Sequence, residues 1–200
     1  MIKQDIARIV VVGTSFGGLT ALQTLLPALP KNFRAPVVIV QHRSREAGSG
    51  LCEFLNKHSS LPVREPEDKE TIMPGHVYLA PRDYHLLLDG ENFALSTEAP
   101  VEYARPSIDV LFESAADAYR EKVLGVILTG ANADGARGLA RIKESGGVCI
   151  VEDPATAESK QMPEAALAAT RVDQISPLAG IAPLLVELCR SPLARRKHAV

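Results

Sequence analysis

The feature that most constrains this chain is a serine in a glycine-rich turn between a buried strand and a helix. Residues 9–12 form an unbroken β-branched run, typical of a strand covered on both faces in a parallel sheet. An amphipathic helical pattern follows at 19–26. The spacing Gly13-Thr-Ser-Phe-Gly17 matches G-x-S-x-G, in which small residues allow a sharp turn that holds the serine Oγ out of the sheet. Ser15 is therefore a candidate nucleophile, because the positive end of a helix dipole stabilises the negative charge that develops in acyl transfer.

The same turn has two other interpretations, a phosphate-binding loop and an ordinary tight turn. A dinucleotide site is disfavoured, because Ser15 occupies the place of the second glycine in G-x-G-x-x-G. The next expected strand, at 36–41, also ends without a carboxylate that could bind a ribose. No Walker lysine follows the turn, which excludes a P-loop. On the motif alone, a nucleotide site, a tight turn and a nucleophile all stay open.

The length and composition indicate one domain. A chain of 200 residues with 46% hydrophobic content can form one substantial core and is too short for two comfortable domains. We expect a single domain over 1–192 and a basic tail at 193–200. The net charge of −2 offers no electrostatic support for nucleic-acid binding, which depends on clustered Lys and Arg.

The sequence also bears on the compartment of the protein. No apolar run approaches the roughly 20 residues of a membrane span, and the first residues lack the layout of a signal peptide. The three cysteines, Cys52, Cys149 and Cys189, have no metal-binding spacing and suit a reducing compartment. We therefore expect a cytoplasmic protein without membrane insertion.

Hydrophobic runs alternate with helical patterns along most of the chain. We expect strands at 8–13, 36–41, 123–128 and 148–151, and helices at 17–28, 49–57, 107–120, 135–145, 162–169 and 177–190. This alternation predicts an α/β fold with right-handed βαβ units: a doubly wound, mostly parallel sheet with helices on both faces. The Asp89-Gly90 turn signal predicts an antiparallel hairpin over 84–95 at one edge of the sheet. The charged segment 64–70 lacks periodicity and is expected to be an exposed loop.

A serine hydrolase needs a base within hydrogen-bond reach of the serine and a group that orients this base. His42 directly follows the strand expected at 36–41, which we expect to lie beside the strand that carries Ser15. The other four histidines are expected in turns, at the surface or in structural hydrogen bonds: His58, His76, His85 and His198. His42 is therefore the candidate base.

The candidate for the orienting acid is Asp134, in a glycine-rich turn after the buried run at 123–128. Its alternative role is the N-cap of the helix expected at 135–145, which would stabilise that helix by about 1 kcal/mol. Asp153 is the only rival at a comparable strand end. Ligands of such sheets lie beyond the carboxyl ends of the strands, where Ser15, His42 and Asp134 are all expected.

Seven motifs recur in the order of a known family. They are Val10-Val-Val-Gly-Thr-Ser-Phe-Gly-Gly18, Val40-Gln-His42, Pro74-Gly-His-Val-Tyr-Leu-Ala-Pro81, Arg105-Pro-Ser-Ile-Asp-Val-Leu-Phe112, Gly125-Val-Ile-Leu-Thr-Gly130, Asp134-Gly135 and Gln161-Met-Pro-Glu-Ala-Ala166. In these motifs the chain resembles the catalytic domain of the chemotaxis receptor methylesterases, the CheB family. The resemblance implies a doubly wound α/β fold that is not the α/β-hydrolase fold. It also implies hydrolysis of γ-glutamyl methyl esters on the methylated helical region of chemotaxis receptors, often with deamidation of receptor glutamines.

The resemblance assigns the family's nucleophile to Ser15, its general base to His42 and its orienting carboxylate to Asp134. The backbone N–H of Phe16 is the best candidate for an oxyanion donor, and the resemblance alone suggests that of Ala131 as a second. No metal or organic cofactor is required by this chemistry. The order Ser, His, Asp differs from the Ser, Asp, His order of α/β-hydrolases.

The chain departs from the family pattern in three respects. Phe16 stands where the family usually has threonine, and Ala131-Asn132 stands where it usually has Met-Gly. The larger Phe16 side chain could reshape the rim that admits the receptor helix. Family members commonly carry a phosphorylatable receiver domain before the catalytic domain, whereas the catalytic pattern here begins close to Met1. We therefore expect no regulation by such a domain in cis and allow for a separate regulatory protein.

Two other functions stay open beside the hydrolase. The first is a catalytically degenerate module that docks on receptors, which the departures at Phe16 and Ala131 would permit. The second is a nucleotide-binding domain that uses the glycine-rich turn.

Overall fold

A computed structural model describes residues 7–43 and 50–190. The basic tail expected at 193–200, the boundary of the domain at 192, His198 and the first residues of the chain lie outside the described residues. Among the residues described, no helix combines the length and the apolar character that crossing a membrane requires.

The centre of the molecule is a seven-stranded sheet with the strand order β3-β4-β2-β1-β7-β8-β9. The strands are β1 (Ile9–Thr14), β2 (Val37–Gln41), β3 (Val63–Arg64), β4 (Val77–Leu79), β7 (Val123–Ile127), β8 (Val148–Glu152) and β9 (Gln174–Ser176). Every pairing in this sheet is parallel, as the alternation of strands and helices predicts. The edge strands β3 and β9 were not expected, and β3 takes in Arg64, the first residue of the segment predicted as a loop.

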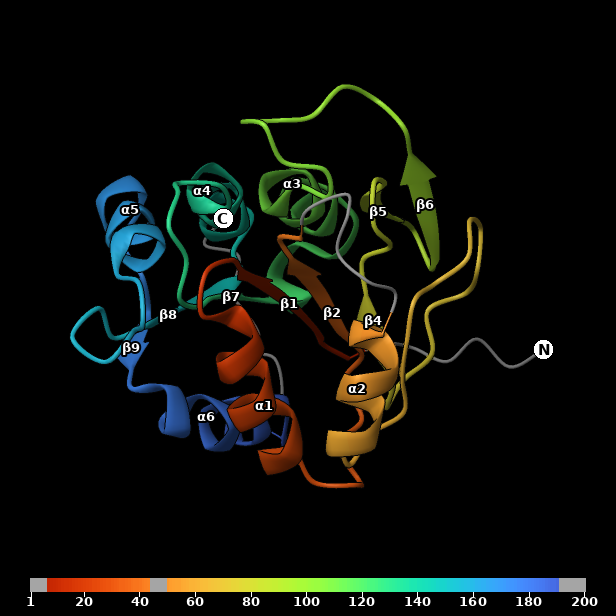
Figure 1. Cartoon of the computed structure of the whole chain (residues 1–200), viewed down its shortest axis with the longest axis horizontal. Helices are drawn as coiled ribbons and strands as arrows, with labels where there is room; N and C mark the ends of the chain where they lie inside the picture. Colours follow the sequence, from red (N-terminus) through yellow and green to blue (C-terminus); the bar gives the residue numbers. More distant parts are fainter. Residues whose placement is uncertain (1–6, 44–49, 191–200) are drawn as a thin grey trace, which may run out of the picture.

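Helices cover both faces of the sheet, which confirms the doubly wound prediction. The helices α1 (Gly18–Ala28), α2 (Leu51–His58) and α6 (Leu178–Arg190) lie on one face, and α3 (Ile108–Tyr119), α4 (Ala136–Glu144) and α5 (Gln161–Ala169) lie on the other (Figure 1). A short 3-10 helix, η1 (Arg120–Lys122), joins α3 to β7. The polypeptide thus forms three layers with the sheet in the middle.

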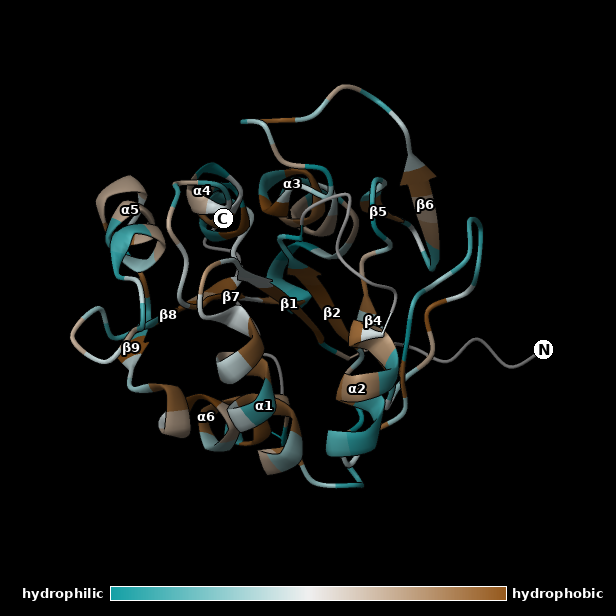
Figure 2. Ribbon diagram, viewed as in Figure 1, coloured by the Kyte–Doolittle hydropathy of each residue, from teal (hydrophilic) through white to brown (hydrophobic). Residues whose placement is uncertain are grey.

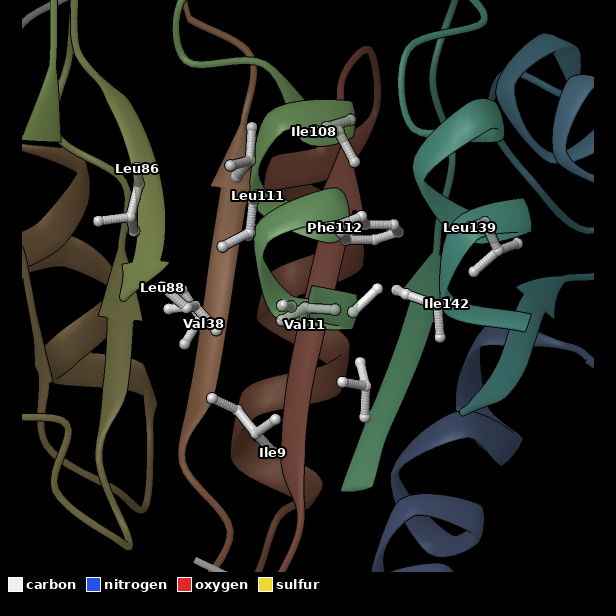
Figure 3. Packing of buried hydrophobic residues seen from close by; sticks show 14 of the residues in the cluster. Ile9, Val11, Val38, Leu86, Leu88, Ile108, Leu111, Phe112, Leu139 and Ile142 are labelled. Atoms are coloured by element: carbon white, nitrogen blue, oxygen red, sulfur yellow. The ribbon is translucent and has the colours of Figure 1, made fainter. Parts of the chain in front are cut away.

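The central strands are apolar throughout because both of their faces are covered. Alternate side chains of β1 enter different cores: Val11 packs with the α3 and α4 side, and Val10 and Val12 pack with the α1 and α6 side. Figure 2 shows this as hydrophobic colour along the strands between two layers of amphipathic helices. In Figure 3, Ile108 and Phe112 of α3 lie over the sheet in the first of these cores.

The predicted hairpin is present, formed by β5 (His85–Asp89) and β6 (Asn92–Ser96) around the turn at Asp89-Gly90. Its strands form a separate two-stranded sheet, with an added antiparallel bridge from Asn92 of β6 to Thr71, so the hairpin does not extend the edge of the main sheet. Instead β5 packs against α3, with Leu86 and Leu88 buried in the same core (Figure 3). The apolar face of the hairpin is therefore covered by a helix rather than by a neighbouring strand.

The strand order places the site. From β1 the chain first adds β2 on one side and later returns with β7 on the other. Such a reversal opens a crevice at the carboxyl ends of the strands, where ligands of doubly wound sheets bind. The backbone ties the three strand ends together, because Ser15 N donates to Thr129 O at 3.0 Å and His42 N donates to Thr14 O at 3.0 Å.

Candidate active site

Ser15 lies in the turn directly after β1, with its side chain partly exposed. Gly17, the N-cap of α1, has a φ of 80°, a left-handed conformation that favours glycine. A Cβ at Gly17 would lie 2.7 Å from Oε2 of Glu158. This carboxylate therefore lies against the N-terminus of α1, where it opposes the binding of a phosphate and weakens the nucleotide interpretation of the turn.

Two polar side chains hold the backbone of this turn. Gln41 Nε2 donates to Ser15 O and to His42 O, both at 2.9 Å. Thr129 Oγ1 donates to Phe16 O at 2.9 Å, so the end of β7 is tied to the residue after the serine. Neither role was predicted from the sequence; the available signal was a polar residue at the carboxyl end of an otherwise apolar strand.

His42 and Asp134 form a direct pair. His42 Nε2 lies 2.8 Å from Asp134 Oδ2, and the aspartate side chain is fully buried. Burial acts to raise the pKa of Asp134, but the hydrogen bond from His42 and the backbone donors of Asp109 and Ile108 outweigh it. The pKa of Asp134 is thus lowered, and its carboxylate is ionised at neutral pH beside the imidazole.

The carboxylate of Asp134 accepts hydrogen bonds from the N-terminus of a helix, but not of the helix that follows it. Its Oδ2 accepts from Ile108 N at 2.7 Å, and its Oδ1 accepts from Asp109 N at 3.0 Å and from Ser107 Oγ at 2.9 Å. All of these donors lie at the N-terminus of α3, whereas the N-cap of α4 is Gly135. The same carboxylate therefore holds the start of α3 and faces His42.

Asn132 completes a ring of three hydrogen bonds with this pair. Asp134 N donates to Asn132 Oδ1 at 3.3 Å, and Asn132 Nδ2 lies 3.3 Å from His42 Nδ1. Because Oδ1 accepts the backbone N–H, the amide nitrogen faces the ring as a donor, and Nδ1 must be the acceptor. The imidazole proton is therefore assigned to Nε2, which donates it to Asp134, and Nδ1 carries the free electron pair.

Ser15 and His42 directly follow the ends of two adjacent strands. Thr14 and Gln41, the residues before each of them, are register partners of adjacent parallel strands. Among the described residues, Ser15 Oγ forms no hydrogen bond, and the Nδ1 position is taken by Asn132. In enzymes without substrate, the contact between a nucleophile and its base is often long, and it tightens when substrate binds.

The sequence model of the family described as CheB methylesterase matches residues 10–185. The chain belongs to the CheB methylesterase family. It is similar in structure to the crystal structure of the Thermotoga maritima CheB methylesterase catalytic domain, with a TM-score of 0.87 and 39% identity over 91% of this chain and 98% of that one. The doubly wound fold that the resemblance implies is thereby confirmed.

Two relatives show how the chain aligns within the family. It is 46% identical to a relative from Leptospira interrogans, over 94% of this chain and 97% of the relative. It is 44% identical to the protein-glutamate methylesterase/protein-glutamine glutaminase 1 of Cupriavidus pinatubonensis, over 92% of this chain and 54% of that protein. The chain thus aligns with nearly the whole of the first relative and about half of the second.

Of the two expected oxyanion donors, Phe16 directly follows Ser15, and Ala131 lies two residues after Thr129, whose carbonyl accepts from Ser15 N. The backbone N–H groups of Phe16 and Ala131 donate to no described residue. The N–H of Ser15 itself is used by Thr129 O. Phe16 is 61% exposed, so its side chain projects from the turn while its backbone stays beside the serine.

The remaining candidates serve local structure. The buried His85 places Nε2 3.1 Å from Ala99 O and accepts from Ser107 N at 3.2 Å, which confirms its structural role. His58 and His76 contact backbone carbonyls of their own segments. Asp153 accepts from Ala155 N at 2.9 Å and serves its own turn. No cluster of three His, Cys, Asp or Glu side chains with the arrangement of metal ligands occurs in the described part of the chain.

A cleft of about 390 Å³ adjoins His42 and Asn132. Its other wall is the loop 100–106, which Arg105 holds by donating to Asp83 Oδ1 at 2.8 Å and to Thr97 O at 2.7 Å. Tyr103 is fully exposed on this loop. A larger cavity of about 910 Å³ near the start of β1 contains none of the candidate catalytic residues. The smaller cleft is therefore the one placed to admit a substrate.

Proposed function

We propose that this chain is a protein-glutamate methylesterase that removes methyl groups from γ-glutamyl methyl esters of chemotaxis receptors. The observation that carries the proposal is the contact of His42 Nε2 with the buried, ionised Asp134, which leaves Nδ1 as the basic nitrogen of the imidazole. The names of the relatives support protein-bound glutamate esters as substrates and, as a second activity, deamidation of glutamine. The methylated helical region of a receptor would enter the cleft lined by His42 and Asn132.

In the first half of the reaction, His42 Nδ1 takes the Ser15 proton as Oγ attacks the ester carbonyl carbon. The N–H groups of Phe16 and Ala131 would bind the oxyanion of the tetrahedral intermediate. Collapse of this intermediate expels the methoxy group, which takes the proton from Nδ1 and leaves as methanol. Asp134 stays ionised and stabilises the charged imidazole throughout.

In the second half, water replaces methanol. His42 Nδ1 removes a proton from water as its oxygen attacks the glutamyl ester of Ser15. The second tetrahedral intermediate releases Ser15, which regains its proton from Nδ1, and the receptor glutamate leaves as a carboxylic acid that loses its proton to solvent. With a glutamine substrate, ammonia leaves in the place of methanol. The imidazole is used in the reverse sense to the trypsin-like triad, in which Nε2 is the base and Nδ1 faces the aspartate.

Methanol release from a methylated receptor tests the proposal. Wild type and Ser59→Ala, a matched serine variant in a turn remote from the cleft, should release methanol at equal rates. Ser15→Ala should lose most of the activity. Equal rates for wild type and Ser15→Ala would reject Ser15 as the nucleophile. If wild type binds the receptor but releases no methanol, the chain is a receptor-docking module instead. A separate regulatory protein and a cytoplasmic location remain predictions.

A further inference from the structure

Two buried carboxylates cap each other's helices beside the candidate active site. Asp109, in the first turn of α3, accepts from Gly135 N at 3.0 Å and from Gly138 N at 2.7 Å, both at the start of α4. In return, Asp134 accepts from Ile108 N and Asp109 N at the start of α3. The N-termini of α3 and α4 are thus joined by a reciprocal exchange, and Asp109 belongs to neither the proton transfer nor the oxyanion site.

The charge on Asp109 is costly where it lies. The side chain is 1% exposed. Burial and the neighbouring charge of Asp134 raise its pKa to about 6, against the opposing hydrogen bond from Gly138 and the charge of Arg137. Arg137 Nε lies 3.6 Å from Asp109 Oδ2, and the further acid facing it is Glu113 on its own helix. A neutral polar side chain could accept the same N–H groups without burying a second charge, so helix capping alone does not account for a carboxylate.

The contact with Gly135 connects Asp109 to the reacting groups. Gly135 follows Asp134 directly and has a φ of 97°, a left-handed conformation that favours glycine. Because glycine has no side chain, no side-chain contact of its own holds this conformation. The hydrogen bond from its N–H to Asp109 fixes the peptide that carries the Asp134 carbonyl. A shift at this peptide would move the Asp134 carboxylate relative to His42 Nε2, which it meets at 2.8 Å.

We propose that Asp109 is a positioning residue of the methylesterase reaction: its ionised carboxylate holds the turn at 134–135 and so aligns Asp134 with His42. This inference rests on the proposed function for its kinetic consequences, whereas the alignment itself is measurable without substrate. Since the acceptor weakens when it is protonated, the ionised form of Asp109 supports the alignment. The acid limb of the activity then depends on Asp109 as well as on the base.

The test compares Asp109→Ala, Asp109→Asn and the control Glu113→Gln. Glu113 lies on the same helix and accepts from the same Arg137 at 2.7 Å, but it does not contact the turn. Asp109→Ala should lower kcat by about 10- to 100-fold with KM within about twofold, because small misplacements cost this much in rate. Asp109→Asn keeps an acceptor oxygen but not the charge, so it should recover only part of this loss at pH 8. Glu113→Gln should match wild type.

Two readouts separate positioning from a merely structural role. The ratio of kcat for wild type to kcat for Asp109→Asn should be several-fold at pH 8 and should fall toward 1 below about pH 6, where Asp109 of wild type is itself neutral. The proton NMR signal of the His42 Nε2–H should be lost or broadened in Asp109→Ala and kept in Asp109→Asn and Glu113→Gln. The NMR result holds even if wild type releases no methanol, which would reject the proposed function alone.

Clear outcomes would overturn the inference. A folded Asp109→Ala that keeps both the NMR signal and wild-type kcat would remove any positioning role. If Asp109→Ala does not fold, Asp109→Asn still decides the matter, because a ratio of wild-type to Asp109→Asn kcat that does not change with pH would contradict the inference.

Discussion

Asp134 Oδ2 meets His42 at Nε2, at 2.8 Å, and this contact decides which ring nitrogen is free to act on Ser15. The hydrogen bonds of Asn132 with His42 Nδ1 and with Asp134 N fix the rotation of the imidazole. Each of these partners can be changed separately.

Asp134→Asn should lower kcat by about 10⁴-fold with little change in KM, because an amide no longer holds the imidazole in the required tautomer. Steady-state methanol release from methylated receptor measures the effect. Asp153→Asn, at the rival strand end, should behave as wild type. A loss of less than about tenfold in Asp134→Asn would mean that another group orients His42.

Asn132→Gly, which restores the family's usual residue, should raise kcat/KM by about 2- to 10-fold. The amide occupies His42 Nδ1 in the resting enzyme, and a hydrogen bond of this kind contributes about 0.5–1.5 kcal/mol. Reaction of Ser15 with a phosphonate ester under matched conditions gives a second measure of the same competition. Asn32→Ala, in the remote cavity, is the control. A fall in kcat/KM would show instead that the Asn132 amide assists the reaction.

Gln41→Leu should destabilise the protein by about 1–3 kcal/mol, since it leaves His42 O without its donor, whereas Ser15 O keeps the N–H of Gly18. Urea denaturation measures the free energy of unfolding. The catalytic rate should fall as well, because both residues lose a restraint on their backbone. Unchanged stability would mean that water replaces the amide.

The pH dependence of stability should distinguish the two buried carboxylates. The pKa of Asp109 is raised in the folded protein to about 6. At a pH between the ordinary carboxyl pKa and this value, folding is therefore coupled to proton uptake by Asp109. The contribution of Asp109 to stability falls as pH rises across that window. The pKa of Asp134 is lowered, so its contribution is present above the ordinary value and is lost as pH falls through the folded one.

The difference in unfolding free energy between Asp109→Asn and wild type isolates the pH-dependent contribution of Asp109 to stability. It should shift in favour of the variant by on the order of 2–3 kcal/mol between pH 4 and pH 7. Urea denaturation at several pH values measures it. A difference independent of pH would mean that Asp109 titrates normally in the folded protein.

Most of the architecture follows from the order of apolar runs. The buried strands β1, β2 and β7 can be predicted from the sequence, because a strand covered on both faces needs a continuous apolar run. The strands β3 and β9 are too short to show a period, so they were missed. The hairpin was found from Asp89-Gly90, but its packing on α3 depends on a helix distant in the sequence.

The candidate site was likewise predictable from the sequence only in part. The sequence by itself determined that Ser15, His42 and Asp134 follow strand ends, because parallel strands bring their carboxyl ends to one edge of the sheet. Only the tertiary structure decided that Asp134 caps α3 rather than α4, that it meets Nε2 of His42, and that Asp109 returns the exchange. These contacts join residues more than 20 positions apart, and they depend on how α3 and α4 dock on the sheet. Local periodicity records which face of an element is buried, whereas the partner of a buried polar atom is set by that docking.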